Sequence, residues 1–252
     1  MKEREALFDY VIRQADNCLI LGQRLGEWCG HGPVLEQDIA LTNISLDLIG
    51  QCRSLYQYAA EVEGEGHTED DLAYLRDAWQ FRNFLLLEQP NRDFAYTVTR
   101  QFFFDAFNYY YYAELINSSD DQMVAIAHKS IKEVTYHLKW SSEWMLRLGG
   151  GTEESRTRVT RAIEGLWSFT GELTEADDID NLMQETGVGV DLEKIKVSWR
   201  AKVSEVFTEV GLVIPEDTWM QSGGKQGTHT EHLGYILADL QFLQRSYPGA
   251  TW

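Results

Sequence analysis

The sequence predicts an all-α protein built from long helices joined by short links. Apolar side chains recur at steps of three and four residues, the spacing that keeps them on one face of an α-helix. Four prolines occur in 252 residues, and each stands beside polar residues or glycines, where helices are expected to end. Neither sustained two-residue alternation nor an Asn-Gly turn occurs in the sequence, so no strand is predicted.

The first two helices are predicted over residues 4–28 and 33–63. Pro33 can begin the second helix because the first turn of a helix needs no backbone N–H. Along this helix, one stripe of mostly apolar side chains recurs at steps of three and four, so that face is expected to meet a core. The stripe consists of Leu41, Ile44, Leu48, Gln51, Leu55, Tyr58 and Val62.

The other helices follow from capping residues and breaks. Asp70 and Asp71 suit the positive N-terminal end of a helix, and Asp191 suits an N-cap. The remaining helices are predicted over 68–88, 93–116, 121–149, 152–169, 191–211 and from Thr228 or Thr230 to 247, with an acidic connector at 175–180. No linker or repeat interrupts this pattern, which indicates one domain over 1–252 and a helical bundle.

Net charge, hydropathy and cysteine spacing exclude several classes of function and location. The net charge of −18 repels phosphate backbones, so nucleic-acid binding is not expected. No apolar run reaches the roughly 18 residues that a membrane span needs. The first residues lack the apolar stretch of a secretory signal, and the three cysteines form no C-x-x-C pair. These features predict a cytoplasmic protein with reduced thiols.

A long-helix bundle invites a search for a di-iron site of the ferritin-like kind. In such proteins two helices each supply a Glu, and two others each supply Glu-x-x-His, whose members share a helix face. No histidine of this sequence has an acidic residue three positions earlier. The residues at that position are, in chain order, Trp28, Gly64, Ala125, Val134, Gln226 and His229.

The positions that remain look like a degenerate ligand set. Val134 stands one turn before the inward-facing His137, and Leu48 and Gln51 form the comparable pair on the second helix. Asp105, among phenylalanines, is predicted to form a buried hydrogen-bonded pair with His137. We therefore expect no metal in this chain. The alternative is a free-standing di-iron oxygenase with an atypical site built from Asp105, His137 and Glu36 or Glu133.

Several stretches resemble the C subunit of bacterial ring-1,2-phenylacetyl-CoA epoxidase, of the ferritin-like superfamily. The longest is DNCLILGQRLGEWCGH at 16–31, and the resemblance spans essentially the whole chain. The shorter matches are LDLIG at 46–50, LEQPN at 87–91, IKE at 131–133, YHL at 136–138, GGK at 223–225, GTHTEHLG at 227–234, QR at 244–245, PG at 248–249 and the final Trp252.

The resemblance implies a ferritin-like up-down bundle without catalytic metal. It implies pairing with a homologous A subunit that holds the di-iron centre, in a complex with a B subunit and a reductase that epoxidises phenylacetyl-CoA in aerobic phenylacetate degradation. The A subunit's Asp-Glu-Ala-Gly-His motif resembles 47–51 of this sequence, and its Glu-x-x-His motif resembles 134–137. Its ligands have thus become Leu48, Gln51 and Val134, so no metal ligand is carried over.

The resemblance also implies that this chain can touch the CoA part of the substrate. The candidates on the third predicted helix are Gln80, Phe81, Arg82 and Asn83, and a second set after the acidic connector is Asn181, Leu182 and Met183. Arg82 could bind a phosphate and Phe81 an adenine ring. The alternative for the first set is the ordinary surface of an amphipathic helix.

His229 and His232 could share a metal. Thr230 and Glu231 between them are typical of the start of a capped helix, and we prefer this second interpretation. The glycine-rich stretch 223–227 is expected to pack against another element or a partner. The sequence therefore favours a structural subunit that stabilises the A subunit. It leaves open an independent oxygenase and a self-associating scaffold.

Overall fold

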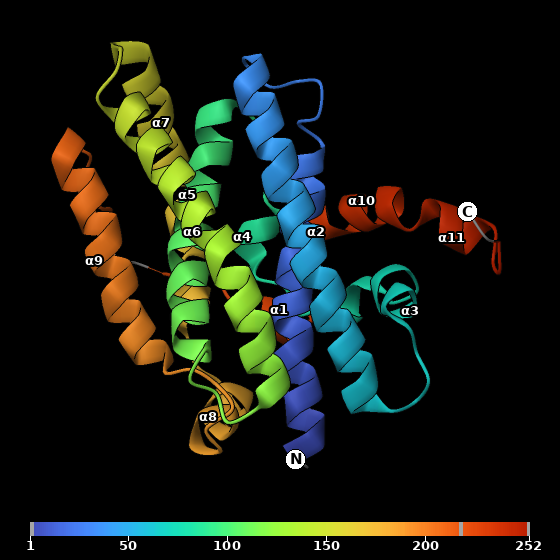
Figure 1. The fold of residues 1–252 in the computed structure, drawn as a ribbon. Helices are drawn as coiled ribbons and strands as arrows, with labels where there is room; N and C mark the ends of the chain where they lie inside the picture. The colour runs from blue at the N-terminus through green and yellow to red at the C-terminus, as the bar shows by residue number, and fades with distance from the viewer. Residues whose placement is uncertain (1–2, 217–218, 251–252) are drawn as a thin grey trace. The chain divides into compact units, whose positions relative to one another are not determined.

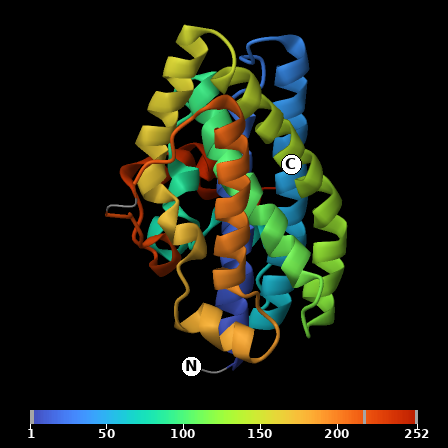
Figure 2. The ribbon, with the colours of Figure 1, turned by 90° about the vertical axis from the view of Figure 1, so that its left-hand side faces the viewer.

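The computed structural model describes residues 3–216 and 219–250, and within these ranges every regular element is helical (Figures 1 and 2). This confirms the predicted all-α class. No helix in the described ranges is long and apolar enough to cross a bilayer. The chain divides into two compact units, Met1–Pro90 with Gly223–Trp252 and Asn91–Ser222, which are described separately below. The single domain over 1–252 stays a prediction.

The first unit is built on two long helices, α1 (Glu3–Gly26) and α2 (Leu35–Glu63), which run side by side in opposite directions (Figure 1). The Ser45 hydroxyl donates to the Gly22 carbonyl across the pair, at 2.7 Å. The unit also contains α3 (Glu69–Tyr74), a 3-10 turn (Ala78–Gln80), α4 (Leu85–Glu88), a second 3-10 turn (Gly224–Gln226), α10 (Glu231–Leu240) and α11 (Phe242–Ser246).

The second unit is centred on α5 (Phe94–Leu115), most of whose residues are buried. It packs against α6 (Asp121–Gly149), α7 (Glu153–Leu166) and α9 (Leu192–Val210), and α9 runs alongside it in Figure 2. The indole of Trp199 donates to the Phe103 carbonyl at 2.9 Å and lies 5.9 Å from the Phe103 ring, which fixes α9 on α5. A shorter helix, α8 (Asp178–Glu185), precedes α9.

Most helix starts match the sequence because the capping residues act locally. The side chains of Thr68, Asp93, Asp120, Thr152 and Asp191 each accept a hydrogen bond from a backbone N–H in the first turn of α3, α5, α6, α7 and α9. The predicted stop at 211 is also confirmed. Gly211 closes α9 with φ 66°, a left-handed conformation that glycine adopts without steric cost.

The predicted helix over 68–88 is wrong. Helix α3 ends at Tyr74, and an irregular segment follows before α4 begins at Leu85. Asp77 starts a new turn by exchanging hydrogen bonds with Gln80. The amides of Arg82 and Phe84 then donate to the side chains of Asp16 and Asn17 on α1. Tertiary hydrogen bonds therefore replace the helical ones.

Three smaller expectations also fail. Pro33 lies before the N-cap of α2, because the helix begins only at Leu35. The acidic connector at 175–180 runs into α8, because Asp177 and Asp180 form a capping box. The last predicted helix is interrupted at Gln241, whose amide nitrogen donates to the Ala73 and Arg76 carbonyls.

Candidate functional site

The degenerate ligand positions of the second unit surround one buried carboxylate. Asp105 on α5 is 1% exposed, and His137 and Val134 on α6 are fully buried. Asp105 accepts hydrogen bonds from Gln101 Nε2 at 2.6 Å and Ser141 Oγ at 2.7 Å. These are its only hydrogen-bond partners among the described residues, so the predicted direct hydrogen bond to His137 is not made.

Burial dominates the chemistry of Asp105. Removal from water raises the pKa of this carboxyl to about 6, although the charge on His137 and the hydrogen bonds from Ser141 and Gln101 each oppose the rise. Asp105 is therefore close to half protonated near pH 6. Such a group is a poor source of negative charge for a metal pair.

The other two degenerate positions belong to the first unit. Leu48 and Gln51 lie on the buried face of α2, and Gln51 Oε1 accepts a weak hydrogen bond from Cys18 Sγ at 3.8 Å. An aliphatic side chain and a neutral amide replace the carboxylate and imidazole that a di-iron site needs. Glu36, proposed for an atypical site, lies on the exposed first turn of α2.

The donor set therefore does not fit a di-iron centre. Of the five positions, only Asp105 and His137 carry the ligand types that such a centre uses, and one carboxylate cannot balance the charge of two irons. In the described ranges, the one group of three potential ligand side chains close enough to hold a metal is Glu63, Glu65 and His67, in which both glutamates and the histidine are at least partly exposed.

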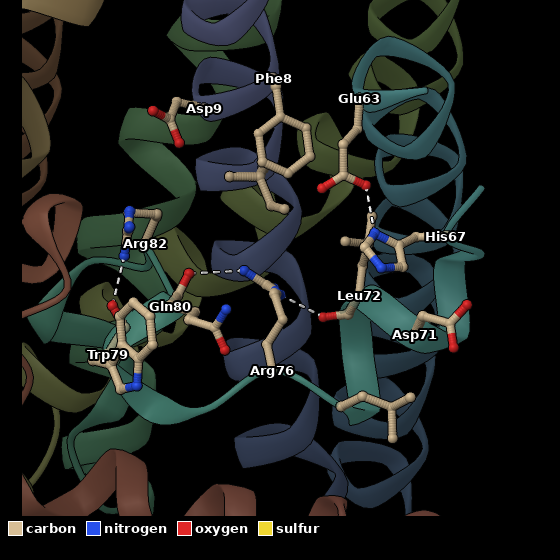
Figure 3. Close-up of a pocket in the computed structure, with 12 residues that line it drawn as sticks. Phe8, Asp9, Glu63, His67, Asp71, Leu72, Arg76, Trp79, Gln80 and Arg82 are labelled. Atoms are coloured by element: carbon tan, nitrogen blue, oxygen red, sulfur yellow. Dashed lines mark hydrogen bonds and ion pairs between the residues drawn. The ribbon is translucent and has the colours of Figure 1, made fainter. Parts of the chain in front are cut away.

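A second polar centre, in the first unit, organises the segment that follows α3. Asp16 is fully buried on α1, forms an ion pair with Arg76, and accepts from Tyr56 Oη at 2.5 Å and from the Arg82 amide at 2.7 Å. Burial alone would lower the pKa of Arg76, but the adjacent Asp16 raises it. Arg76 Nη1 also donates to the Gln80 carbonyl at 3.0 Å (Figure 3). These bonds fix residues 76–84 in an irregular path that contains the 3-10 turn Ala78–Gln80.

The structure separates the first set of predicted CoA contacts into buried and accessible residues. The Phe81 ring is fully buried beneath the Arg76 guanidinium, 4.2 Å away, and Asn83 is fully buried as well. Either side chain would have to leave the core to touch a ligand. Arg82 is partly exposed, and the nearby Trp79, which is not among the predicted contacts, is 65% exposed.

Trp79, Gln80 and Arg82 line a cavity of about 340 Å³ (Figure 3). Its walls are apolar at Phe8 and Leu72 and acidic where Asp9, Glu63 and Asp71 enter the lining. Arg82 Nη1 donates to the carbonyls of Trp79 and Phe81, at 2.8 and 2.9 Å. Its Nη2 and Nε have no partner among the described residues, so this edge of the guanidinium can bind an anion.

The second set of candidates lies on α8 in the other unit, not in an irregular break. Asn181 is exposed and Leu182 half-buried, while Met183 is fully buried and its carbonyl accepts from the Gly189 amide at 2.7 Å. Asn181 therefore offers the accessible polar group of this set. Binding of CoA by either set stays a prediction.

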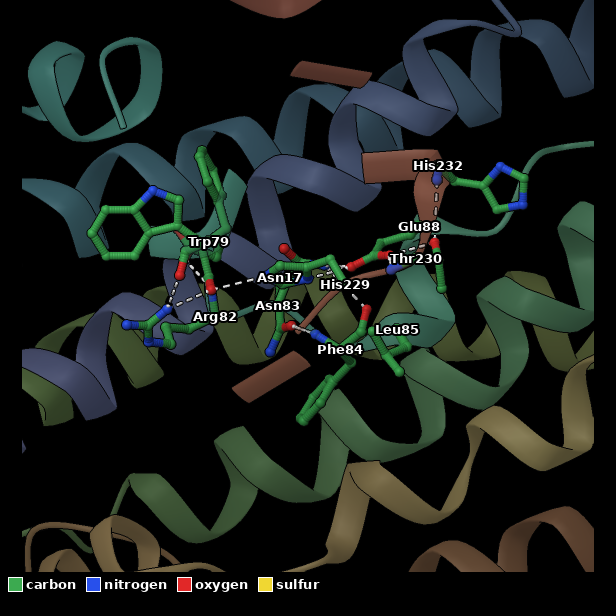
Figure 4. Close-up of polar contacts among 12 residues, drawn as sticks. Asn17, Trp79, Arg82, Asn83, Phe84, Leu85, Glu88, His229, Thr230 and His232 are labelled. Carbon is green, nitrogen blue, oxygen red and sulfur yellow. Dashed lines mark hydrogen bonds and ion pairs between the residues drawn. The ribbon is translucent and has the colours of Figure 1, made fainter. Parts of the chain in front are cut away.

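The metal hypothesis for His229 and His232 is wrong. Both ring nitrogens of His229 are engaged, Nδ1 with Glu88 Oε1 at 2.6 Å and Nε2 with the Phe81 carbonyl at 2.9 Å (Figure 4). The preferred interpretation is confirmed, because Thr230 caps α10 by accepting from the His232 amide. Glu231 is the first residue of that helix.

Asp16, Asn17 and Glu88 are not among the functional residues predicted from the sequence. For Asp16 and Asn17, one feature of the local sequence indicates a role. Residues 13–17 contain polar side chains at four of five positions, within a helix whose neighbouring residues are apolar on every face. A helix interior that is polar all round and still buried indicates hydrogen-bond partners elsewhere in the chain.

Comparison with known proteins decides the family. The phenylacetic acid catabolic protein family matches residues 1–252. The chain belongs to this family. It is 50% identical over 243 residues to the C subunit of the 1,2-phenylacetyl-CoA epoxidase of Escherichia coli K12, covering 96% of this chain and 98% of that one. The resemblance inferred from the sequence motifs is thereby confirmed.

A solved structure supports the fold. The "Protein 19 with aldehyde deformylating oxidase activity" from Synechococcus superposes with a TM-score of 0.55 over 85% of this chain and 95% of that chain, at 14% sequence identity. At that identity the likeness concerns the fold alone. The ferritin-like helical fold predicted for this member of the phenylacetic acid catabolic protein family is confirmed.

Proposed function

We propose that this chain is the non-catalytic subunit of a phenylacetyl-CoA epoxidase, which pairs with and stabilises a homologous di-iron A subunit in the cytoplasm. One observation carries the proposal. The positions that would hold the metal in a ferritin-like oxygenase are occupied by Leu48, Gln51 and Val134, in a chain that is 50% identical to the C subunit of such an epoxidase. The B subunit and the reductase are the other expected partners.

The outer face of α2 is our candidate for the surface that meets the A subunit. Leu35, Ile39, Leu46 and Ile49 lie at helical spacing on this face and are 72, 51, 63 and 39% exposed. Such a stripe of exposed aliphatic side chains marks a contact with another protein. A homologous helical subunit presenting its own apolar face suits it, because permanent interfaces between subunits are large and apolar.

Co-expression with the A subunit tests this proposal. The two chains are expected to elute as one complex in size-exclusion chromatography, with iron present only when the A subunit is present. Leu46→Glu should weaken the complex by placing an unpaired charge in the interface. Val197→Glu on α9, at a site 72% exposed, is the matched control. About two irons in this chain purified alone, or separate elution of the two wild-type chains, would overturn the proposal.

A contribution to CoA binding is the second part of the proposal. The free edge of Arg82 and the exposed indole of Trp79 suit a phosphate and an adenine ring respectively. We expect Arg82→Gln to weaken binding of phenylacetyl-CoA to the assembled complex by about tenfold, the factor for one hydrogen bond to a charged group.

The control for Arg82→Gln is Arg53→Gln. It removes the same charge from α2, where Arg53 is exposed and pairs with Glu69. Isothermal titration calorimetry measures both variants. Equal affinity of Arg82→Gln and Arg53→Gln would exclude Arg82 from the substrate site.

A further inference from the structure

The glycine-rich stretch before α10 packs directly on the segment that carries Trp79 and Arg82. Gly227 has φ 80°, and a Cβ atom added there would lie 2.3 Å from the Trp79 carbonyl oxygen and 2.7 Å from Arg82 Nη1. No side chain larger than hydrogen fits at that distance. The expectation that this stretch packs against another element is therefore confirmed, and the contact is made by backbone against backbone.

A buried carboxylate, that of Glu88, also joins the glycine-rich stretch to the segment that carries Trp79 and Arg82. It does so at Thr230, three residues after Gly227. The Glu88 side chain is fully buried at the end of α4. Its Oε2 accepts from the Thr230 amide at 2.8 Å and the Thr230 hydroxyl at 2.6 Å, and its Oε1 accepts from Asn83 Nδ2 at 3.0 Å (Figure 4). Glu88 thus connects the start of α10 to the residue after Arg82.

His229 makes the fourth hydrogen bond to Glu88 and also contacts the backbone of Phe81, within the segment 79–83. Its Nε2 faces the Phe81 carbonyl, which only accepts, so Nε2 must carry a hydrogen. Its Nδ1 faces the Glu88 carboxylate at 2.6 Å. An ionised carboxylate only accepts, so opposite an ionised Glu88 the Nδ1 atom also donates and the ring is a cation. Its side chain is 5% exposed, so this charge pair is screened from water.

The charges around His229 favour that state. Burial alone would lower the pKa of His229, but the hydrogen bonds to Glu88 and Phe81 outweigh burial and raise it, with a smaller contribution from Asp16 on α1. Arg24, also on α1, faces the backbone of Glu88 instead, donating Nε and Nη2 to its carbonyl at 3.1 and 2.7 Å. Lys225 lies over the Phe84 ring, 5.9 Å away.

We propose that residues 223–230 form a clasp that positions residues 79–83, with His229 as the charged positioning residue and Gly227 as the close contact. The clasp sets where the Arg82 guanidinium and the Trp79 indole lie, and it opens when His229 loses its proton. Its value for substrate binding rests on the proposed function, whereas its effect on residues 79–83 does not.

Hydrogen exchange on the full-length chain tests the clasp without substrate. His229→Gln is expected to raise the exchange rate of amides in 79–88 by about tenfold, the factor for losing a hydrogen bond to a charged group. His232→Gln is the matched control, because the ring of His232 makes no hydrogen bond to a described residue. Gly227→Ala should have the same effect as His229→Gln. Its control is Gly234→Ala on α10, where a Cβ meets nothing within 4 Å.

The pH profile distinguishes a charged His229 from a merely structural side chain, and its first measurement uses the wild type alone. After correction for intrinsic exchange, protection of 79–88 in the wild type should fall as pH rises through the raised pKa of His229, because deprotonation removes one donor. His229→Gln should lack this step. Protection of 79–88 that does not change with pH, or that is equal in His229→Gln and His232→Gln, would overturn the clasp.

Phenylacetyl-CoA titration of the assembled complex then separates the two proposals. If the clasp variants release 79–88 and also weaken binding, with the control variants unchanged, both proposals are supported. If they release 79–88 while binding is unchanged, the clasp stands and the role of Arg82 in substrate binding fails. If exchange is unchanged, the clasp fails whatever the affinity.

Discussion

Each unit contains a buried carboxylate near an imidazole, and the two carboxylates differ in the number of hydrogen bonds that they accept. Glu88 accepts four hydrogen bonds, from Asn83, His229 and the amide and hydroxyl of Thr230. Asp105 accepts two, both from neutral side chains, and its pKa is raised to about 6. Donors that replace water favour the ionised form of a buried carboxyl, and Asp105 has half as many of them as Glu88.

The difference shows what each site is suited to do. The Glu88 cluster is complete, and it joins segments that lie 141 residues apart in the chain. The Asp105 cluster contains one carboxylate and one imidazole, fewer than a di-iron site of the ferritin-like kind uses. In this chain, the first is a structural junction and the second a position where burying a charge costs stability.

The largest effect is expected from removing the Glu88 carboxylate. Glu88→Ala leaves the buried donors of Asn83, His229 and Thr230 without their acceptor, which should lower the free energy of unfolding at pH 7 by about 3–5 kcal/mol. Urea denaturation measures this change. Glu231→Ala, in the exposed first turn of α10, should cost no more than about 1 kcal/mol through the helix dipole. Equal losses for the two variants would show that the Glu88 cluster contributes no more to the free energy of unfolding than an exposed glutamate does.

Asp105→Asn should raise the free energy of unfolding at pH 7, the opposite of the effect of Glu88→Ala. The folded-state pKa of about 6 lies above the ordinary 3.8, so the folded chain binds this proton more tightly and loses stability as pH rises from about 4 through 6. That loss is about 3 kcal/mol for a shift of roughly two pKa units. The Asn variant should lack it and be the more stable protein at pH 7.

The matched control for Asp105→Asn is Asp121→Asn in the exposed first turn of α6, which should keep the wild-type pH dependence. Urea denaturation from pH 4 to 8 measures all three proteins. If wild type and Asp105→Asn have parallel stability curves over that range, Asp105 does not titrate near pH 6.

The features that the sequence predicted are local ones. N-caps at Thr68, Asp120 and Asp191 depend on residues within one turn, and so does the search for an acid three positions before a histidine. That search identified the degenerate ligand set, although it could not show that Ser141 takes the place of His137 as the hydrogen-bond donor to Asp105.

The features that the sequence did not predict depend on partners far along the chain. A continuous helix over 68–88 is compatible with local propensity, and it fails because Asp16 and Asn17, more than 60 residues earlier, bind the amides of Arg82 and Phe84. The role of Glu88 was not predicted for the same reason. Its four donors come from Asn83 and from a segment near the C-terminus.

The smallest effects come from removing one hydroxyl donor from each carboxylate. Thr230→Val takes one of four donors from Glu88, so the loss should be about 1–2 kcal/mol. Ser141→Ala takes one of only two donors from Asp105, which can respond by keeping its proton.

The Ser141→Ala loss should therefore be small at pH 5, where Asp105 is mostly protonated, and approach about 1.5–3 kcal/mol at pH 8, where a charged acceptor loses its donor. Ser198→Ala is the control and should show no pH dependence, because this hydroxyl donates to the Lys194 carbonyl and to no other described residue. Thermal and urea unfolding at both pH values measure the contrast. A Ser141→Ala loss that does not change with pH would mean that this donor does not influence the pKa of Asp105, because only an ionisable acceptor converts a lost donor into a pH-dependent cost.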